Sequence, residues 1–201
     1  MYYFLSLFLL LTAEISEPLE NKKVLFVIAH RNFRDEEYKI PRRILENAGA
    51  DIIVASSDTS EAKGMIELTL KPDVLLSEVN CKEFDAVVFI GGTGATEYWE
   101  HKTAHAIIDS MYNQNKIIAA ICIASVILAK AGILEGKKAT VHETPATVRI
   151  FKEQKVKYTG EPVTVVSTRD TNPDIITANS PLAAKRFGEE ILRLLLKKKE
   201  K

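Results

Sequence analysis

The sequence predicts an α/β fold, in which a mainly parallel sheet carries helices on both of its faces. Short apolar runs alternate with helical patterns along most of the 201 residues, and such strand–helix–strand units place successive strands in parallel. Two of the runs, VLFVI at 24–28 and AVVFI at 86–90, are apolar at every position, as expected of strands covered on both faces. A chain of this length suffices for one domain with a sizeable core.

The first half of the chain begins this alternation. The run KVLFVIA at 23–29 predicts a buried strand, and apolar periodicity then predicts a helix over 35–48 and a strand over 51–56. Apolar and polar residues alternate over 65–79 around Pro72, which favours a hairpin-like excursion.

The second half continues the same pattern. A strand is expected at 85–90, a helix at 96–113 and a strand at 116–121, directly before Cys122. The remaining expected elements are a helix after Cys122, a short strand at 136–141, a strand pair at 163–168 and 174–179, and a closing helix at 181–197.

A separate apolar segment precedes the domain. The run YYFLSLFLLLT at 2–12 is too short to span a bilayer as a helix. It is similar to the apolar part of a secretory signal, with Ala13 near a cleavage point, but no Lys or Arg precedes it. We therefore separate residues 1–21 from a single domain over 22–201. We expect a cytoplasmic protein, with export or membrane association through residues 1–21 as the alternative.

The charge balance and the cysteines exclude several classes of function. Lys plus Arg and Asp plus Glu both total 27, so no basic surplus points to a nucleic-acid partner. Cys81 and Cys122 match neither a metal-ligand spacing nor a disulfide framework, although one bridge between them is possible.

A short run of histidines allows two interpretations. His101 and His105 lie one helical turn apart, with Glu97 one turn earlier. These residues could form a metal site or a solvated helix face. We favour the solvated face and expect no metal site.

Four groups that could take part in catalysis or binding follow predicted strands. Glu36 and Glu37 follow the first strand, GGTGA at 91–95 follows the strand at 85–90, Cys122 follows the next one, and His142 follows the strand at 136–141. Ligands of such sheets bind beyond the carboxyl ends of the strands. We therefore expect a carboxylate, a glycine-rich turn, a thiol and an imidazole at one edge.

The residues around Cys122 match the pattern of a nucleophile elbow. The segment AICIA at 120–124 places small residues two positions on either side of the cysteine, where bulky ones would clash at a strained turn. The helix that follows would direct its first amides at the sulfur and favour the thiolate. The alternative is a buried cysteine that merely begins a helix.

The glycines after the third predicted strand could add backbone amides to the site of Cys122. Gly91 and Gly92 allow the backbone to approach closely. With the amide of Ile123, they could form an oxyanion hole or hold an oxidised sulfur. A simple tight turn is the alternative.

Together these motifs resemble the ThiJ/PfpI family, also called the DJ-1 superfamily. The resemblance covers about residues 23–195 and depends on AAIC before the elbow helix, GG after the preceding strand, EYKIP in the first helix, GKKATVH, and ITANSPLAAKRFGEEIL. It implies a flavodoxin-like α/β sandwich, a homodimer and no cofactor.

The resemblance also implies roles for individual residues. Glu37, four residues before Pro41, matches a buried, protonated carboxyl group that is hydrogen-bonded to the reactive cysteine, which here is Cys122. His142 matches a histidine beside that cysteine. Ile123 stands where the peptidase-like PfpI branch has a histidine, so the chain is closer to the DJ-1 branch. Glu36 is expected to be an exposed acid in the first turn of its helix.

We therefore expect Cys122 and Glu37 to act on a small reactive carbonyl or its protein adduct, as in a glyoxalase or deglycase. The alternatives are a redox-sensing chaperone in which Cys122 is oxidised, and a PfpI-like cysteine peptidase or hydrolase. Burial beside a thiolate should raise the pKa of Glu37, and the helix amides should lower the pKa of Cys122.

Overall fold

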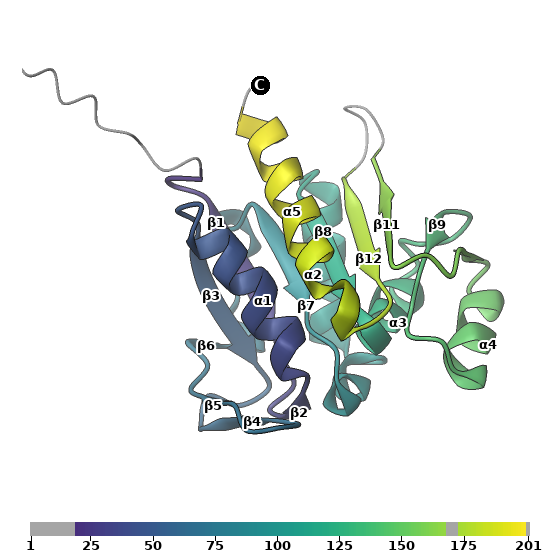
Figure 1. Cartoon of the computed structure of the whole chain (residues 1–201), viewed down its shortest axis with the longest axis horizontal. Coiled ribbons are helices and arrows are strands. Elements are labelled where there is room, and N and C mark those ends of the chain that lie inside the picture. Colours follow the sequence, from purple (N-terminus) through teal and green to yellow (C-terminus); the bar gives the residue numbers. More distant parts are fainter. Residues whose placement is uncertain (1–18, 168–172, 200–201) are drawn as a thin grey trace, which may run out of the picture.

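A seven-stranded sheet forms the centre of the computed structural model, which describes residues 19–167 and 173–199 (Figure 1). Its strand order is β11-β12-β8-β7-β1-β3-β6, and all neighbours are parallel except β11 and β12. The mainly parallel α/β fold predicted from the sequence is confirmed. The strands are β1 (Lys23–Val27), β3 (Asp51–Ser56), β6 (Val74–Leu75), β7 (Ala86–Phe89), β8 (Ile117–Ile121), β11 (Val163–Val166) and β12 (Ile175–Ala178).

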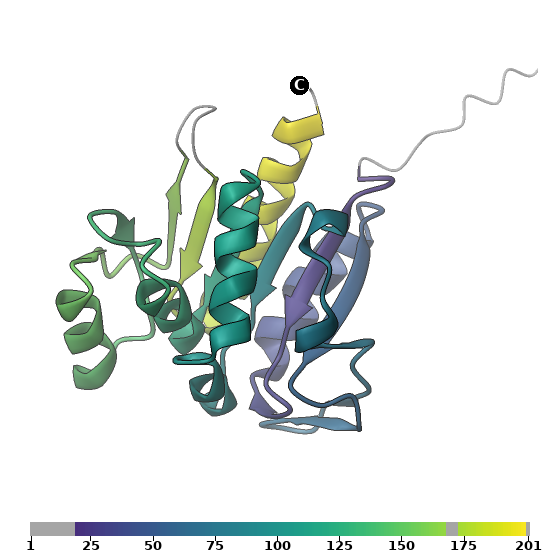
Figure 2. The same ribbon diagram turned by 180° about the vertical axis from the view of Figure 1, so that it is seen from behind.

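Helices cover both faces of this sheet, as Figures 1 and 2 show from opposite sides. On one face lie α1 (Asp35–Glu46) and α5 (Ala184–Lys199), and on the other lies α2 (Lys102–Asn113), with α3 (Ser125–Lys130) packed beside it. A Cβ at Gly188 in α5 would lie 2.9 Å from Cα of Pro41 in α1. The missing side chain thus lets the two helices approach each other.

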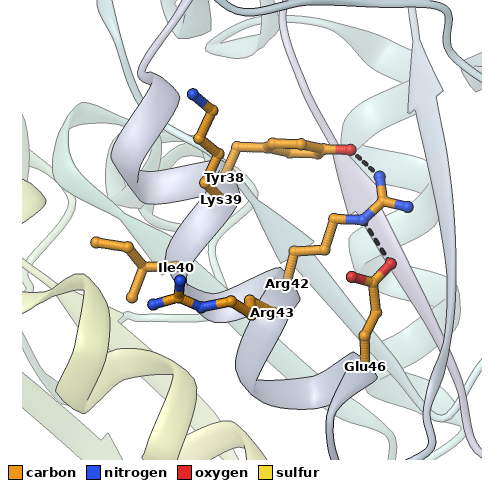
Figure 3. A pocket seen from close by; sticks show the side chains of 6 residues that line it. All are labelled: Tyr38, Lys39, Ile40, Arg42, Arg43 and Glu46. Atoms are coloured by element: carbon orange, nitrogen blue, oxygen red, sulfur yellow. Dashed lines mark hydrogen bonds and ion pairs between the residues drawn. The ribbon is translucent and has the colours of Figure 1, made fainter.

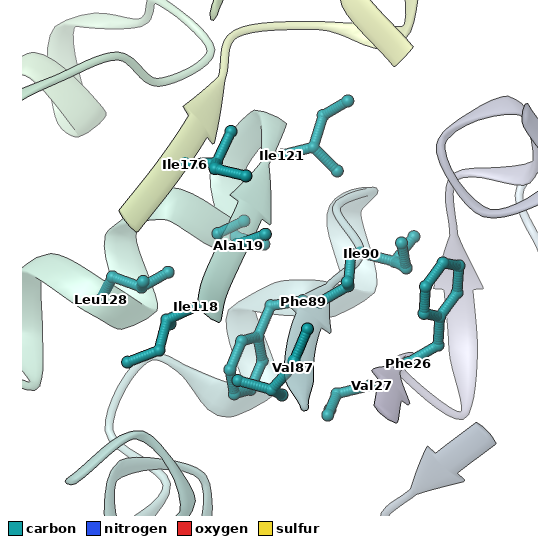
Figure 4. Packing of buried hydrophobic residues seen from close by; sticks show 14 of the residues in the cluster. Phe26, Val27, Val87, Phe89, Ile90, Ile118, Ala119, Ile121, Leu128 and Ile176 are labelled. Carbon is teal, nitrogen blue, oxygen red and sulfur yellow. The ribbon is translucent and has the colours of Figure 1, made fainter. Parts of the chain in front are cut away.

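The central strands of the sheet form the middle of the core. Every residue of β7 and β8 is buried, and β1 is buried after Lys23. Figure 4 shows Val27, Val87 and Phe89 beside one another in this core. Because these strands are covered on both faces, they are apolar at almost every position.

The expected hairpin around Pro72 is wrong. The antiparallel pair is instead β4 (Ala62–Gly64) with β5 (Thr69–Leu70), which forms a small sheet with β2 (Arg31–Phe33). Pro72 precedes β6, which joins the main sheet beside β3. The turn occurs earlier than expected because Asp35 accepts hydrogen bonds from the backbone N–H groups of residues 66–68, at 2.7–3.1 Å.

The helix expected over 96–113 is interrupted. A 3₁₀ helix, η3 (Thr93–Tyr98), ends before α2 begins, and the His101 side chain caps α2 by accepting the N–H of Ala104 at 3.4 Å. Glu97 therefore lies on a different element from His101 and His105. The other 3₁₀ helices are η1 (Leu76–Glu78), η2 (Cys81–Glu83), η4 (Cys122–Ala124) and η5 (Pro181–Ala183).

The region before His142 also differs from expectation. The strand expected at 136–141 is only β9 (Lys138–Ala139), and it pairs with β10 (Lys157–Tyr158) outside the main sheet. A helix that was not predicted, α4 (Pro145–Glu153), follows it. Thr144 caps this helix and Pro145 begins it, a combination that marks helix starts in sequences.

Among the described residues, no helix is long and apolar enough to cross a membrane. Residues 1–18 of the predicted N-terminal segment lie outside the described part of the chain.

Candidate active site

Cys122 lies at the turn between β8 and η4, and its backbone has a φ of 60°. A non-glycine residue in this left-handed region costs about 1–3 kcal/mol and persists only where its surroundings hold it. The flanking small residues, Ala120 and Ala124, are fully buried. The strained elbow predicted from the spacing of small residues is therefore present.

Glu37 reaches Cys122 from the first turn of α1. Its side chain is 0 % exposed, and Oε2 accepts the backbone N–H of Gly91 at 3.1 Å. A hydrogen bond joins the carboxyl group to the thiol of Cys122. Oε1 is buried and has no hydrogen-bond partner in the described structure, which favours the neutral acid form of the carboxyl group.

Gly91 makes this contact between helix and elbow possible. A Cβ at this position would lie 2.5 Å from Oε2 of Glu37, 2.6 Å from Cβ of Cys122 and 2.7 Å from the carbonyl oxygen of Ile121. Only glycine therefore fits between the acid and the thiol.

Three backbone amides divide their roles at this site. The N–H groups of Ile123 and Gly92 bond to the sulfur of Cys122, whereas the N–H of Gly91 is used by Glu37. The expectation that Gly91 offers a free amide to a substrate oxygen is therefore corrected. Gly92, at a φ of 99°, turns its amide to the sulfur where an L residue would be strained.

Burial dominates the protonation of the pair. It raises the pKa of Glu37 to about 8, although hydrogen bonds from Cys122 and Gly91 lower it. Burial also raises the pKa of Cys122 to about 12, and the charge of an ionised Glu37 adds to this rise, while the amides of Ile123 and Gly92 oppose it. The predicted rise for Glu37 is confirmed. The predicted lowering for Cys122 is wrong, because removal of the sulfur from water outweighs the amide hydrogen bonds.

Cys122 opens into a pocket of about 330 Å³. Met65, Ile123 and Pro181 give it apolar walls, and its remaining lining residues are Arg34, Glu37, Gly92, Thr93, Cys122 and His142. His142 is exposed to solvent. Its backbone N–H donates to the carbonyl of Cys122 at 3.4 Å, which brings this predicted site residue to the elbow although β9 lies outside the main sheet.

Three residues support the site although the sequence analysis assigned them no role in it. Asp35, which is 2 % exposed, ties the turn that carries Met65 to the start of α1 through its three backbone hydrogen bonds. Arg34 lies in the pocket wall. Trp99 Nε1 donates to the carbonyl of Ile123 at 3.2 Å and braces the elbow helix. Of the three, only Asp35 could have been found from the sequence, because it begins a predicted helix.

Other candidates fall outside this site. Glu36, expected to be exposed, is half-buried and paired with Arg34. His105 lies 3.0 Å from the carbonyl oxygen of Trp99 through Nε2. No three metal-ligating side chains gather in the part of the chain that the structure describes, and Cys81 and Cys122 are both free.

A larger pocket, of about 490 Å³, lies along α1 (Figure 3). Arg42 donates hydrogen bonds to the hydroxyl of Tyr38 and, at 2.7 Å, to Oε1 of Glu46. These side chains are committed to one another, and no thiol or imidazole lines this pocket. Another pocket, of about 500 Å³, is lined by Glu143, Thr144, Pro145 and Val148, so volume alone would not have selected the pocket of Cys122.

The model of the DJ-1/PfpI family matches residues 22–194. This chain belongs to the DJ-1/PfpI family. An uncharacterised protein of Methanocaldococcus jannaschii is 37% identical over 188 residues, which are 93% of this chain and 89% of that protein.

Two further relatives carry functional names. A deglycase of Pyrococcus horikoshii is 34% identical over 118 residues, or 59% of this chain and 70% of that protein. A glutathione-independent glyoxalase of Caenorhabditis elegans is 26% identical over 174 residues, or 87% of this chain and 89% of that protein.

Among solved structures, a ThiJ/PfpI domain protein from Brachyspira murdochii superposes with a TM-score of 0.79 at 32% identity. The alignment covers 88% of this chain and 96% of that one. The flavodoxin-like sandwich implied by the sequence resemblance is thus confirmed, while assignment to the DJ-1 branch rather than the PfpI branch stays a prediction.

Proposed function

We propose that this protein detoxifies small reactive carbonyl compounds, in the manner of a glyoxalase or deglycase, with Cys122 as nucleophile and Glu37 as proton carrier. One observation carries the proposal: a strained cysteine opens into a small pocket and is hydrogen-bonded to a carboxyl group whose pKa of about 8 keeps it protonated at neutral pH. The names of the Pyrococcus and Caenorhabditis relatives support the same reaction class.

The two pKa values decide which group of the pair loses its proton first. Glu37, with a pKa of about 8, ionises before Cys122, whose pKa is about 12. The Glu37 carboxylate would then be the general base that takes the thiol proton as the sulfur attacks, while the amides of Ile123 and Gly92 stabilise the charge that develops on sulfur. With a pKa of about 8 for Glu37, about a tenth of the pair is in this form at pH 7.

With methylglyoxal, the thiolate would add to the aldehyde carbon. A C–S bond forms, the carbonyl π electrons move to oxygen, and Glu37 supplies the proton of the resulting hemithioacetal. Proton transfer from the former aldehyde carbon to the neighbouring carbonyl, through Glu37 or His142, gives a lactoyl thioester. Water then releases lactate and restores the thiol. One carbon is oxidised and its neighbour is reduced, so no external oxidant is needed.

The decisive test compares the two cysteines. Lactate formation from methylglyoxal should fall by about 100-fold or more in Cys122→Ala, and the activity of the wild type should rise with pH through about 8. Cys81→Ala, which removes an equally buried thiol, should retain activity. A Cys122→Ala variant with the wild-type rate would contradict the proposal.

A second candidate function, redox sensing, is supported by the donors around the sulfur. The amides of Ile123 and Gly92 and the acid form of Glu37 could hold the two oxygens of a sulfinate. Mild peroxide followed by intact-mass measurement should then add two oxygens at Cys122 while the protein stays folded. A peptidase is less well supported, because Ile123 offers no general base. The expected homodimer and cytoplasmic location stay predictions.

A further inference from the structure

The pocket of Cys122 has one permanently charged wall. Of the residues that line it, Arg34 alone has a side chain that is cationic at every working pH. After the hydrogen bonds from Cys122 and Gly91, its charge also lowers the pKa of Glu37. The other walls are formed largely by Met65, Ile123 and Pro181, which carry no charge.

The guanidinium is held in position and still has donors to offer. Its Nε lies 2.8 Å from Oε2 of Glu36, and Nη2 donates to Oε1 of Glu36 at 3.0 Å. The Arg34 backbone N–H donates to the carbonyl of Gly91 at 2.9 Å, which fixes the base of the side chain beside the elbow. Nη1 forms no hydrogen bond within the described structure.

Glu36 pairs with Arg34 from outside the pocket, since it is not among the lining residues. Oε2 of Glu36 and Nε of Arg34 are buried, so this pair holds the guanidinium in place and leaves Nη1 for a ligand. The neighbouring Glu37 is largely protonated at neutral pH and does not repel an incoming anion. A carboxylate in the pocket can therefore accept a charge-assisted hydrogen bond from Nη1.

We propose that Arg34 is the specificity-determining residue of this pocket, and that it selects small carbonyl compounds bearing a carboxylate, that is, oxo acids. The inference rests on the proposed function, since it needs Cys122 to be the reactive group. The carboxylate of the oxo acid binds to the guanidinium of Arg34, and its carbonyl carbon is placed against the sulfur of Cys122. Addition forms a C–S bond and breaks the S–H bond, whose proton passes to Glu37. The carbonyl π electrons move to oxygen, which takes a proton from Glu37.

The test separates recognition of charge from reactivity of the thiol. Iodoacetate and iodoacetamide both alkylate a thiolate, forming a C–S bond and releasing iodide, and they differ chiefly in the carboxylate. Their rate constants at Cys122 are measured in the full chain by peptide mass mapping, near pH 7 and at low ionic strength. A change in thiol pKa affects both reagents alike, so the ratio of the two rates isolates recognition of the carboxylate.

Arg34→Met should lower the ratio of iodoacetate to iodoacetamide by about tenfold, the loss of one charge-assisted contact. Arg34→Lys should retain most of the ratio. Glu36→Gln should raise it, because the negative charge that pairs with Arg34 is gone. Arg193→Met is the matched control, since Arg193 is also paired with a glutamate, Glu190, at 2.8 Å, but lies on α5 outside the pocket. Glyoxylate should protect Cys122 from iodoacetamide in the wild type and not in Arg34→Met.

A ratio that Arg34→Met leaves unchanged, in a variant with the wild-type circular dichroism spectrum, would overturn this inference and leave the proposed function standing. A fall in the ratio that Arg193→Met reproduces would overturn it as well, since the effect would then be one of overall charge. A Cys122 that reacts with neither reagent would overturn both the inference and the proposed function.

Discussion

The two cysteines of this chain are almost equally buried, yet only one has the surroundings of a nucleophile. Cys81 is 9 % exposed and Cys122 is 8 % exposed, and each is the first residue of a 3₁₀ helix. Cys81 lies before β7, at the amino ends of the strands, where Lys116 Nζ donates to its backbone carbonyl at 2.8 Å. Cys122 follows β8, at the carboxyl ends.

The difference between them lies in the backbone and the partners. Only Cys122 has a left-handed φ, and only its sulfur receives an acid and two amides. Burial is therefore a poor guide to reactivity. The two thiols differ in which end of the strands they occupy. A cysteine at the carboxyl ends lies where sites form in such sheets, whereas a cysteine at the amino ends does not.

The largest expected effect comes from Gly91→Ala, which separates Cys122 from Glu37. The new Cβ would overlap Glu37 and the elbow, so turnover should fall by about 100-fold and the free energy of unfolding by about 3 kcal/mol. Urea unfolding and lactate formation measure the two losses. Gly132→Ala is the control for turnover: its Cβ would meet nothing within 4 Å, and the strain of an alanine at a φ of 81° should lower stability without lowering turnover. A fully active Gly91→Ala variant would show that contact between acid and thiol is unnecessary.

The next effect concerns stability against pH. Glu37 has a pKa of about 8 in the folded protein against 4.5 ordinarily, so between these values the folded state binds the extra proton. The free energy of unfolding of the wild type should therefore decrease as pH rises through this window, by up to about 1.4 kcal/mol per pH unit. Glu37→Gln lacks this term and should gain relative stability as pH rises from 5 to 8, while losing turnover. Parallel stability profiles for the two proteins would indicate that Glu37 is not protonated in the fold.

The smallest expected effect comes from replacing the other cysteine, Cys81. Cys81→Ala removes a buried sulfur that has no part in the site, so the free energy of unfolding should fall by about 1 kcal/mol. Turnover and the alkylation rate of Cys122 should stay within about twofold of the wild type. A large loss of turnover would mean that the two ends of β7 and β8 are coupled, and that position along the strand is not what separates the two thiols.

Local sequence by itself determined the layered sheet and the elbow. The apolar runs at 24–28 and 86–90 specify buried strands, and two alanines around Cys122 leave room for a left-handed turn. The same local reasoning failed where a remote group decided the outcome. The turn at residues 65–68 is set by Asp35, and β9 leaves the main sheet to pair with β10.

Only the tertiary structure decided the chemistry around the sulfur. The acid, the glycine that admits it and the thiol come from three elements, with Glu37 and Gly91 separated by 54 positions in the sequence. The helix amides at Cys122 were visible in the sequence, but the burial that outweighs them and raises the pKa of Cys122 was not. Amides belong to the local backbone, whereas burial depends on every element that packs around a group. For the same physical reason Arg34 entered the site only when α1 was packed beside the elbow.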